Sequence, residues 1–405
     1  MRSSYDVVII GAGPSGSMGA HKLAKAGLSV VILERLNFPR FVIGESLLPR
    51  CNEILEKNGL LDVIEKQGYT IKGGAIFIDE DKQEEIIDFS ENIGQKWGSS
   101  FQVKREEFDS VLLEEAKKAG VEVLHEMSVS AYDQVNNIIK AVDSDGKESS
   151  FKARFVLDAS GYGRVLPKLL DLDIPSDLKL RNAIFTRIEG EIRREGYHEG
   201  FIDIVIHDNN KVWLWIIPFS DGTTSMGIVC EEEYFSSRGI SEEEFFDEVV
   251  ATHDYLREKL KNAKKLQGVR SIQGYSASIK KMHGDGFALC GNATEFLDPV
   301  FSSGVTLALE SSDRAGELII KELGGEKVDW QKEYEEYMMM GVNVFREFVY
   351  AWYDGKLRTI FYHPEKAESV KRAIASILSG YVWDKNNYFV NDTRKKIDML
   401  VKFCG

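Results

Sequence analysis

The 405-residue sequence predicts an α/β fold with three parts: a domain of alternating strands and helices, a mostly antiparallel sheet inserted into it, and a helical C-terminal region. Three observations support this prediction. Strand and helix patterns alternate through the N-terminal part. Between Ala183 and Cys230 several strand patterns follow one another, with turn signals at 208–210 and 221–222. After about Trp330 the pattern is helical and rich in aromatic residues.

The length is sufficient for two or three domains. The alternating domain is expected to be discontinuous, over residues 1–78, 98–170 and 268–330. The inserted sheet is expected over residues 79–97 and 171–267, and the helical region over 331–405.

Composition excludes several classes of protein. The formal charge of −14 argues against nucleic acid or an anionic membrane surface as the main partner. No apolar run is long enough to span a bilayer, and a strand pattern that begins by Tyr5 leaves no room for a secretory signal. The four cysteines form no CxxC pair and the seven histidines are scattered, so we expect reduced thiols, a cytoplasmic protein and no bound metal.

The most specific signal is the stretch "YDVVIIGAGPSGSMGAHKLAKAGLSVVILE". An apolar strand, Val7–Ile10, leads into a GxGxxG turn, and a helix pattern follows to about Ala26. A second strand, Ser29–Leu33, ends at the acidic Glu34. A lone GxGxxG is weak evidence, but a preceding strand, a following helix and a terminal acid together predict a Rossmann-like dinucleotide site.

Each glycine of this turn has an expected role. Gly11 allows the tight turn, Gly13 lets the backbone approach a pyrophosphate, and Gly16 lets the helix pack on the strand. The free N–H groups at the start of the helix bind the diphosphate, and Glu34 accepts hydrogen bonds from ribose hydroxyls. The expected binding residues are Gly11, Gly13, Pro14, Ser15, Gly16, Glu34 and Arg35.

Two later segments favour FAD over NAD. In "RFVLDASGYGR" a strand, Phe155–Leu157, runs into an Asp-Ala-Ser-Gly turn. In "GFALCGNATEFLDPVFSSGVTLALESS" a strand, Phe287–Cys290, is followed by a turn and by a long helix that starts near Ser303. The positive end of that helix, aimed at a flavin, would stabilise the anionic reduced ring. These segments add Ala159, Ser160, Gly161, Gly291, Asn292, Gly304 and Val305 to the expected FAD contacts.

The order of these motifs resembles the FAD-dependent monooxygenases of the aromatic hydroxylase type, whose fold is shared by geranylgeranyl reductases and flavin-dependent halogenases. Arg105, Phe108 and Asp109 match a further element of that group, and the resemblance implies that Arg105 lies near the flavin. It covers about residues 5–330. One departure is Asn292, where the group usually has Asp; an amide can still accept a hydrogen bond from the ribityl chain but carries no charge.

Four segments are similar to the halogenase branch in particular. They are "FVIGESLLP", similar to the flavin strap; "IKGGAIF", with its lysine; "GNATEFLDPVFSSGV"; and "VWLWIIPF", which fits Trp-x-Trp-x-Ile-Pro. The matching residues are Glu45, Ser46, Lys72, Trp213, Trp215, Pro218, Asp298, Pro299, Ser302, Ser303, Gly304 and Val305.

The resemblance implies a specific chemistry. Reduced FAD and O₂ oxidise a halide to hypohalous acid, and the halide sits at the backbone N–H groups of Ser303, Gly304 and Val305, with Ser302 beside it. Lys72 relays the hypohalous acid, by a hydrogen bond or as a chloramine. Trp213 and Trp215, which share one face of a strand, separate the organic substrate from the flavin, and Pro218 ends that strand. The substrate would be an electron-rich aromatic, possibly tethered to a carrier protein, and a separate reductase would supply the reduced flavin.

Other functions stay open at this stage. A single-component hydroxylase, or a geranylgeranyl-type reductase acting on a hydrophobic substrate, would share the FAD motifs and would need NAD(P)H or another electron donor. A flavin-bound protein without catalytic activity is a third class, against which the intact segments around Lys72, Pro218 and Asp298 argue.

Overall fold

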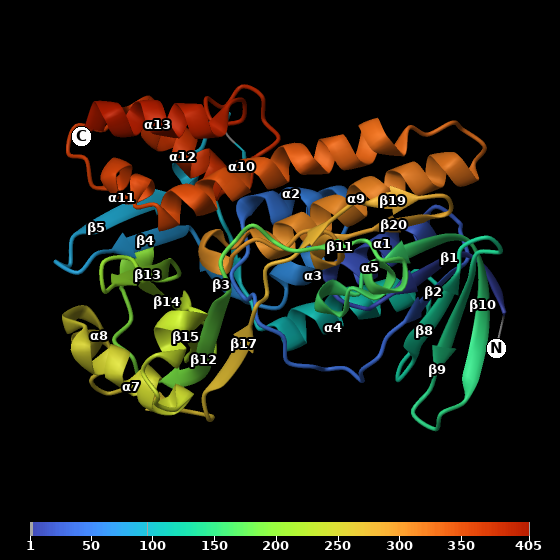
Figure 1. Cartoon of the computed structure of the whole chain (residues 1–405), viewed down its shortest axis with the longest axis horizontal. Helices are drawn as coiled ribbons and strands as arrows, with labels where there is room; N and C mark the ends of the chain where they lie inside the picture. The colour runs from blue at the N-terminus through green and yellow to red at the C-terminus, as the bar shows by residue number, and fades with distance from the viewer. Residues whose placement is uncertain (1–2, 95, 405) are drawn as a thin grey trace.

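The structure, a computed structural model, describes residues 3–94 and 96–404. Its first sheet has the strand order β19-β20-β10-β1-β2-β7, and β9 and β8 extend it from β10 (Figure 1). The strands are β1 (Ser4–Ile10), β2 (Val30–Leu33), β7 (Glu122–Leu124), β8 (Ser128–Asp133), β9 (Ile138–Val142), β10 (Glu148–Asp158), β19 (His283–Gly284) and β20 (Phe287–Leu289). Strands β20, β10, β1, β2 and β7 are parallel, so the alternating pattern is confirmed as a Rossmann-like sheet.

Helices cover this sheet because its strands are apolar on both faces. The last four residues of β1 are fully buried or nearly so, as are all four of β2. Helix α1 packs against α9 and α4, and α2 packs against α9. These helices are α1 (Pro14–Lys25), α2 (Pro49–Lys57), α3 (Leu61–Glu65), α4 (Arg105–Lys118), α5 (Val165–Leu169) and α9 (Ser303–Leu323).

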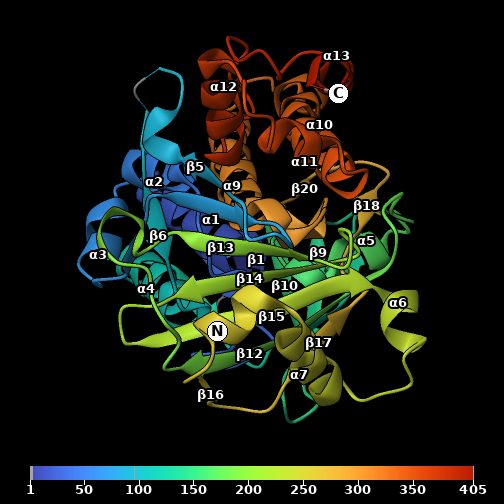
Figure 2. The same ribbon diagram turned by 90° about the vertical axis from the view of Figure 1, so that its left-hand side faces the viewer.

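The second sheet is the expected antiparallel one, with the order β16-β12-β15-β14-β13-β4-β5 and β17 paired to β12 (Figure 2). Its strands are β4 (Gly74–Ile78), β5 (Glu84–Asp88), β12 (Arg181–Glu189), β13 (Ile202–His207), β14 (Val212–Pro218), β15 (Thr223–Glu231), β16 (Lys264–Lys265) and β17 (Arg270–Gln273). Only its β13–β4 pair is parallel among the described residues. The turns at 208–210 and at Gly222 have positive φ, as tight hairpins require.

The expected domain boundaries need correction at two strands. We placed residues up to 78 and from 268 in the alternating domain, but β4 pairs with β13 and β17 pairs with β12. Both strands therefore belong to the second sheet. Their partners are far away in sequence, and local periodicity does not identify such partners. Two short strand pairs, β3 (Thr70–Lys72) with β6 (Ser100–Gln102) and β11 (Asp173–Ile174) with β18 (Ser278–Ile279), lie outside both large sheets.

The second sheet has two buried faces because its strand residues alternate. One face, which includes Phe77, Trp213 and Trp215, joins the main core shared with the first sheet and the C-terminal helices. The opposite face, which includes Leu214 and Ile216, packs against α7 (Glu242–Thr252) and α8 (Asp254–Lys259), next to α6 (Glu232–Ser236). Figure 1 shows α7 and α8 on one side of this sheet and the C-terminal helices on the other.

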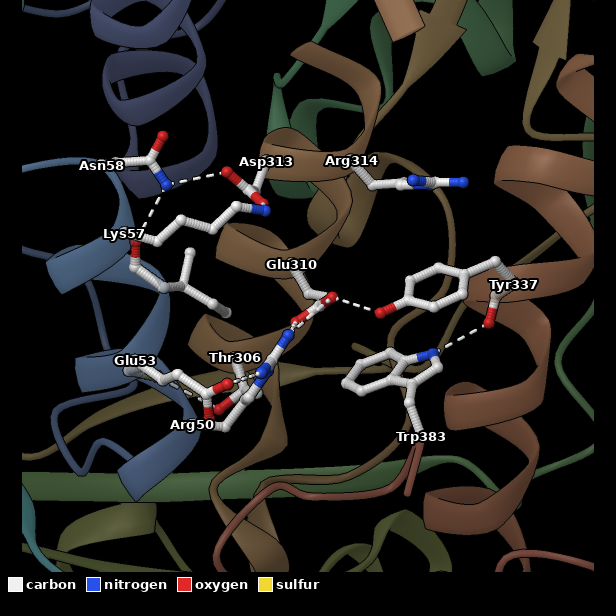
Figure 3. Close-up of polar contacts among 12 residues, drawn as sticks. Arg50, Glu53, Lys57, Asn58, Thr306, Glu310, Asp313, Arg314, Tyr337 and Trp383 are labelled. Atoms are coloured by element: carbon white, nitrogen blue, oxygen red, sulfur yellow. Dashed lines mark hydrogen bonds and ion pairs between the residues drawn. The ribbon is translucent and has the colours of Figure 1, made fainter. Parts of the chain in front are cut away.

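The helical C-terminal region is confirmed. It contains α10 (Glu336–Tyr353), α11 (Lys356–Phe361), α12 (Glu368–Leu378) and α13 (Thr393–Cys404). A polar network ties it to the first domain, as Figure 3 shows. Glu310 of α9 accepts hydrogen bonds from Arg50 Nε at 2.8 Å and from the hydroxyl of Tyr337 at 2.6 Å. Asp313, one turn further along α9, accepts from Lys57 at 2.6 Å. These contacts fix α9 between α2 and α10.

Within the described residues, no helix is both long and apolar enough to cross a bilayer. The same residues contain no cluster of three or more potential metal ligands, and Cys51, Cys230, Cys290 and Cys404 are free thiols.

Candidate active site

The three glycines of the first turn differ in what surrounds them. Gly11 has φ +95°, and a Cβ there would meet Ala159 O at 2.7 Å. A Cβ on Gly16 would lie 2.0 Å from Gly11 O. By contrast, a Cβ on Gly13 would meet only Nη2 of Arg40, at 3.5 Å. Gly11 and Gly16 are therefore required by the protein's own packing, whereas Gly13 leaves space next to the start of α1.

The start of α1 offers donors suited to a diphosphate. Gly13 is the N-cap and no side chain caps it, so the first N–H groups are not used by side chains. The hydroxyl of Ser15 is buried there with no hydrogen-bond partner. Glu34, at the end of β2, accepts from the N–H groups of Ala12 at 2.7 Å and Leu36 at 2.9 Å, which fixes its carboxylate against the turn. These features fit the diphosphate and ribose of a dinucleotide, with Pro14 in the first turn and Arg35 exposed.

The two later motifs converge on the same edge of the sheet. The Ala159–Gly161 turn follows β10 and the Gly291–Ala293 turn follows β20; β10 is the parallel neighbour of β1, and β20 is the next parallel strand beyond it. The buried Asp158 carboxylate accepts from the N–H groups of Ser160 at 2.8 Å and Leu166 at 2.7 Å, which shapes the first turn. Gly291 has φ +54°, and its N–H donates to Ser311. Asn292 lies half-buried in this second turn.

The predicted strap lies against the start of α4. Arg105 donates to the carbonyls of Ile43 at 3.2 Å and Gly44 at 3.4 Å, and its guanidinium pairs with Asp109 at 2.7 Å. Glu45 is buried and accepts from Arg187 at 2.9 Å; burial raises the pKa of its carboxyl. The buried Ser46 hydroxyl has no partner. Arg105 thus positions the strap through backbone carbonyls.

The segment before α9, residues 298–302, forms a further turn of the candidate site. Asp298 caps a short 3₁₀ helix, Pro299–Phe301, by accepting from the N–H of Val300 at 3.1 Å. Ser302 then adopts a left-handed conformation, φ +55°, and α9 begins at Ser303 without a side-chain cap. A Cβ on Gly304 would touch only the ring of Phe296, at 3.3 Å. The N–H groups at Ser303, Gly304 and Val305 are therefore those of an uncapped helix start.

Lys72 is buried, with 1% of its side chain surface exposed, which is unusual for lysine. Its Nζ donates to Leu47 O, at the strap, at 3.0 Å and lies 3.5 Å from Ser302 Oγ, at the α9 turn. The ring of Phe89 lies 5.1 Å away. Burial lowers the pKa of Lys72 to about 7. The structure thus places this amine between the strap segment and the turn before α9.

Trp213 and Trp215 lie on the same face of β14, with ring centroids 6.0 Å apart, and both are buried. Trp215 donates its indole N–H to Ser225 at 3.1 Å, and a Cβ on Gly227 would collide with its ring at 2.2 Å. Trp213 instead donates to the hydroxyl of Tyr353, on α10, at 2.9 Å. Pro218 is the last residue of the strand, as expected.

Three residues around Asp298 were missed by the sequence analysis: Arg181, Tyr275 and Tyr353. The two tyrosine hydroxyls donate to Asp298 Oδ2, Tyr353 at 2.9 Å and Tyr275 at 3.4 Å. The guanidinium of Arg181 stacks over the ring of Tyr353, 3.4 Å from its centroid. No motif marks these residues; the aromatic content of the C-terminal helices was visible, but which ring would reach the site was not.

Comparisons with known proteins cover nearly the whole chain. Residues 4–337 match the family described as FAD binding domain. A 1H-pyrrole-2-carbonyl-[peptidyl-carrier protein] chlorinase of Pseudomonas fluorescens is 30% identical, over 98% of this chain and 94% of that protein. A crystal structure of a flavoprotein/dehydrogenase from Cytophaga hutchinsonii is 43% identical with a TM-score of 0.94, and the match covers 99% of this chain and 98% of that one. The flavin-dependent brominase Bmp2 is 25% identical with a TM-score of 0.86, over 99% and 98% of the two chains.

Proposed function

We propose, for a chain that belongs to the FAD binding domain family and to its flavin-dependent halogenase branch, that it halogenates an electron-rich heteroaromatic ring carried by a carrier protein. The chain is thus an FAD-dependent oxidoreductase. The observation that supports the proposed reaction most strongly is the buried amine of Lys72, held between the strap and the turn before α9.

FAD fits the residues of the site. The diphosphate would lie beside Gly13 and Ser15, and the ribose hydroxyls would meet Glu34. The flavin end would be held by the residues that follow β10 and β20, by the strap and by the start of α9; these are Ala159, Ser160, Gly161, Gly291, Asn292, Glu45, Ser46, Arg105, Asp298, Pro299, Gly304 and Val305. Reduced FAD supplies the electrons that activate O₂ for the oxidation of halide to hypohalous acid.

The halide would bind at the start of α9. This helix has 21 residues, its first N–H groups lack a side-chain cap, and its dipole favours an anion at this end. The hydroxyl of Ser302 lies at the same turn, within reach of Lys72. The site thus brings anion-binding backbone groups next to the relay amine.

Lys72 then receives the hypohalous acid. An amine whose pKa is near 7 is partly neutral at physiological pH, and a neutral amine reacts with hypohalous acid to give an N-haloamine and water. The charged form instead donates a hydrogen bond to the oxidant. Either form keeps the reactive halogen beside the protein chain and away from bulk water.

The Trp213–Trp215 pair would separate the acceptor ring from the flavin. Both indoles lie on the face of the second sheet that points to the shared core, and their buried N–H groups are bonded. Such rigid indoles block direct contact of an organic substrate with the flavin while a small oxidant passes to Lys72.

A carrier-bound pyrrole is the proposed substrate because the chlorinase that matches almost the whole chain acts on one. A separate flavin reductase and a cytoplasmic setting complete the proposal. A dehydrogenase or reductase is the second candidate, since the 43% identical structure is described as a flavoprotein/dehydrogenase.

One assay separates the two candidates. Holoenzyme would be supplied with reduced FAD, air, chloride or bromide, and a carrier protein loaded with pyrrole-2-carboxylate. A halogenated, carrier-bound ring detected by mass spectrometry supports the proposal. Loss of the flavin's electrons to an unsaturated acceptor under anaerobic conditions, with no halogenation in air, would refute it in favour of the reductase.

A further inference from the structure

A chain of partly buried hydrogen bonds connects the tryptophan pair with the turn before α9. The indole N–H of Trp213 donates to the hydroxyl of Tyr353 at 2.9 Å, and that hydroxyl donates to Asp298 Oδ2 at 2.9 Å. The other carboxylate oxygen of Asp298 accepts from the N–H of Val300, which begins the turn that leads to Ser302. Tyr353 therefore contacts both the Trp213–Trp215 pair, here called the wall, and the turn before α9 that is proposed to bind the halide.

The two ends of this chain of hydrogen bonds, Trp213 and Asp298, are buried, and leaving either unpaired would cost free energy. Trp213 and Asp298 each expose 1% of their surface. A buried donor or acceptor that loses its partner costs about 1–3 kcal/mol. Arg181, itself buried, lies over the ring of Tyr353 and its charge stabilises the Asp298 carboxylate, whereas burial raises the pKa of Asp298. Because breaking one of these bonds would leave a buried polar group unpaired, the observed arrangement of the network is favoured over others.

Tyr353 also connects the site to the helical C-terminal region. It is the last residue of α10, and its neighbour Trp352 packs against Phe77 and Phe301 at centroid distances of 5.5 and 6.2 Å. The Nε1 of Trp352 is buried without a partner. Helix α10 therefore contributes Trp352 to an aromatic cluster in the main core and, through Tyr353, a hydrogen bond to Trp213.

We propose that Tyr353 is a positioning residue that locks the indole of Trp213 to Asp298, so that the wall and the halide-binding turn keep one relative arrangement. This role rests on the proposed halogenase function. Loss of the lock lets the indole of Trp213 rotate, and oxidant then escapes before it reaches the acceptor. The expected defect is leakage: O₂ is still consumed, but less halogenated product forms per O₂.

The first test needs no catalysis. Apoprotein labelled with ¹⁵N-tryptophan gives indole N–H signals, and Trp213→Phe identifies that of Trp213. In Tyr353→Phe this signal is expected to shift and to exchange with solvent at least about tenfold faster. Tyr275→Phe is the matched control, because it removes a hydroxyl from the same oxygen of Asp298 but leaves the bond to Trp213 intact.

The second test measures product per O₂ consumed. Tyr353→Phe is expected to lower this ratio at least about fivefold, and Tyr275→Phe to change it less than about twofold. Trp213→Phe removes the donor from the other end, and the double variant Trp213→Phe/Tyr353→Phe should lose no more than the worse single variant, as coupled residues do.

An unchanged Trp213 signal in Tyr353→Phe overturns the proposal, and so do equal losses in Tyr353→Phe and Tyr275→Phe. If Tyr353→Phe does not fold, Trp213→Phe alone still tests the lock: an unchanged ratio overturns it. A wild-type protein that forms no halogenated product refutes the proposed function, whereas the exchange measurement still tests the bond.

Discussion

The glycine turn after β1 and the surroundings of Lys72 are built in opposite ways. The glycine turn comes from one contiguous stretch, and backbone geometry defines it: Gly11 and Gly16 are small because main-chain atoms lie where a Cβ would be. The surroundings of Lys72 are assembled from segments far apart in sequence, which contribute the carbonyl of Leu47, the hydroxyl of Ser302 and the ring of Phe89. A backbone-defined site is local and specific in sequence, whereas a side-chain site depends on the completed fold.

The largest expected effect tests whether the glycine turn is set by packing. Gly16→Val places a side chain where Gly11 O lies 2.0 Å from the Cβ position, and backbone cannot move away cheaply. We expect the apoprotein to lose at least about 3 kcal/mol of unfolding free energy or to fail to fold. Urea unfolding of the apoprotein measures this. A loss below about 1 kcal/mol would mean that the close approach of α1 to β1 is wrong.

Gly13→Val sharpens the comparison within the same turn. Only a flexible arginine side chain lies near its Cβ position, so the apoprotein should keep its thermal midpoint. The valine side chain would, however, occupy the space proposed for the diphosphate. FAD affinity should therefore fall at least about 100-fold, or about 2.8 kcal/mol. Titration of apoprotein with FAD measures the affinity. Normal FAD binding would move the diphosphate away from Gly13.

Lys72→Met tests the desolvation of the amine. The folded pKa of Lys72, about 7, lies below its ordinary value of 10.5, so the unfolded chain binds more protons between these values and stability rises with pH there. The cost of the lysine is complete below pH 7 and disappears toward pH 10.5. The stabilisation of the apoprotein by Lys72→Met should therefore be about 3 kcal/mol larger at pH 6 than at pH 9.5.

Urea unfolding at the two pH values measures this difference, with Lys57→Met, at a half-exposed lysine on α2, as the control. An equal effect of Lys72→Met at both pH values would contradict a buried, pKa-shifted amine.

The smallest expected effect concerns which form of Lys72 reacts. If the neutral amine takes the halogen, the fraction of hypohalous acid converted to product should rise about tenfold between pH 6 and pH 8, because the amine loses its proton near pH 7. Product and total oxidant would be quantified over this range. A ratio that falls with pH would assign the step to the ammonium form and its hydrogen bond.

Backbone-defined parts of the molecule could be predicted from the sequence, whereas parts assembled from distant side chains largely could not. The strands and helices around the first turn, the tryptophan strand and the start of α9 followed from local patterns and glycine chemistry. The membership of β4 in the second sheet did not, because its pairing with β13 is non-local. Burial of Lys72 is opposite to what its residue type predicts, and only the motif resemblance pointed to it. The aromatic-rich pattern of α10 predicts a buried face, but it does not predict that Tyr353 bonds to Trp213 and Asp298.

One measurement on wild type and Lys72→Ala separates the proposed role of the FAD site, which is to make oxidant, from the proposed role of Lys72, which is to relay it. Holoenzyme with reduced FAD, O₂ and bromide would be assayed for hypohalous acid with a small chemical trap and for halogenated carrier-bound product in the same reaction. Because other residues are proposed to hold FAD and the halide, Lys72→Ala should keep trapped oxidant within about twofold of wild type and lose product about 100-fold. Product that persists in Lys72→Ala, or wild-type protein that yields no bromide-dependent oxidant, would contradict the account.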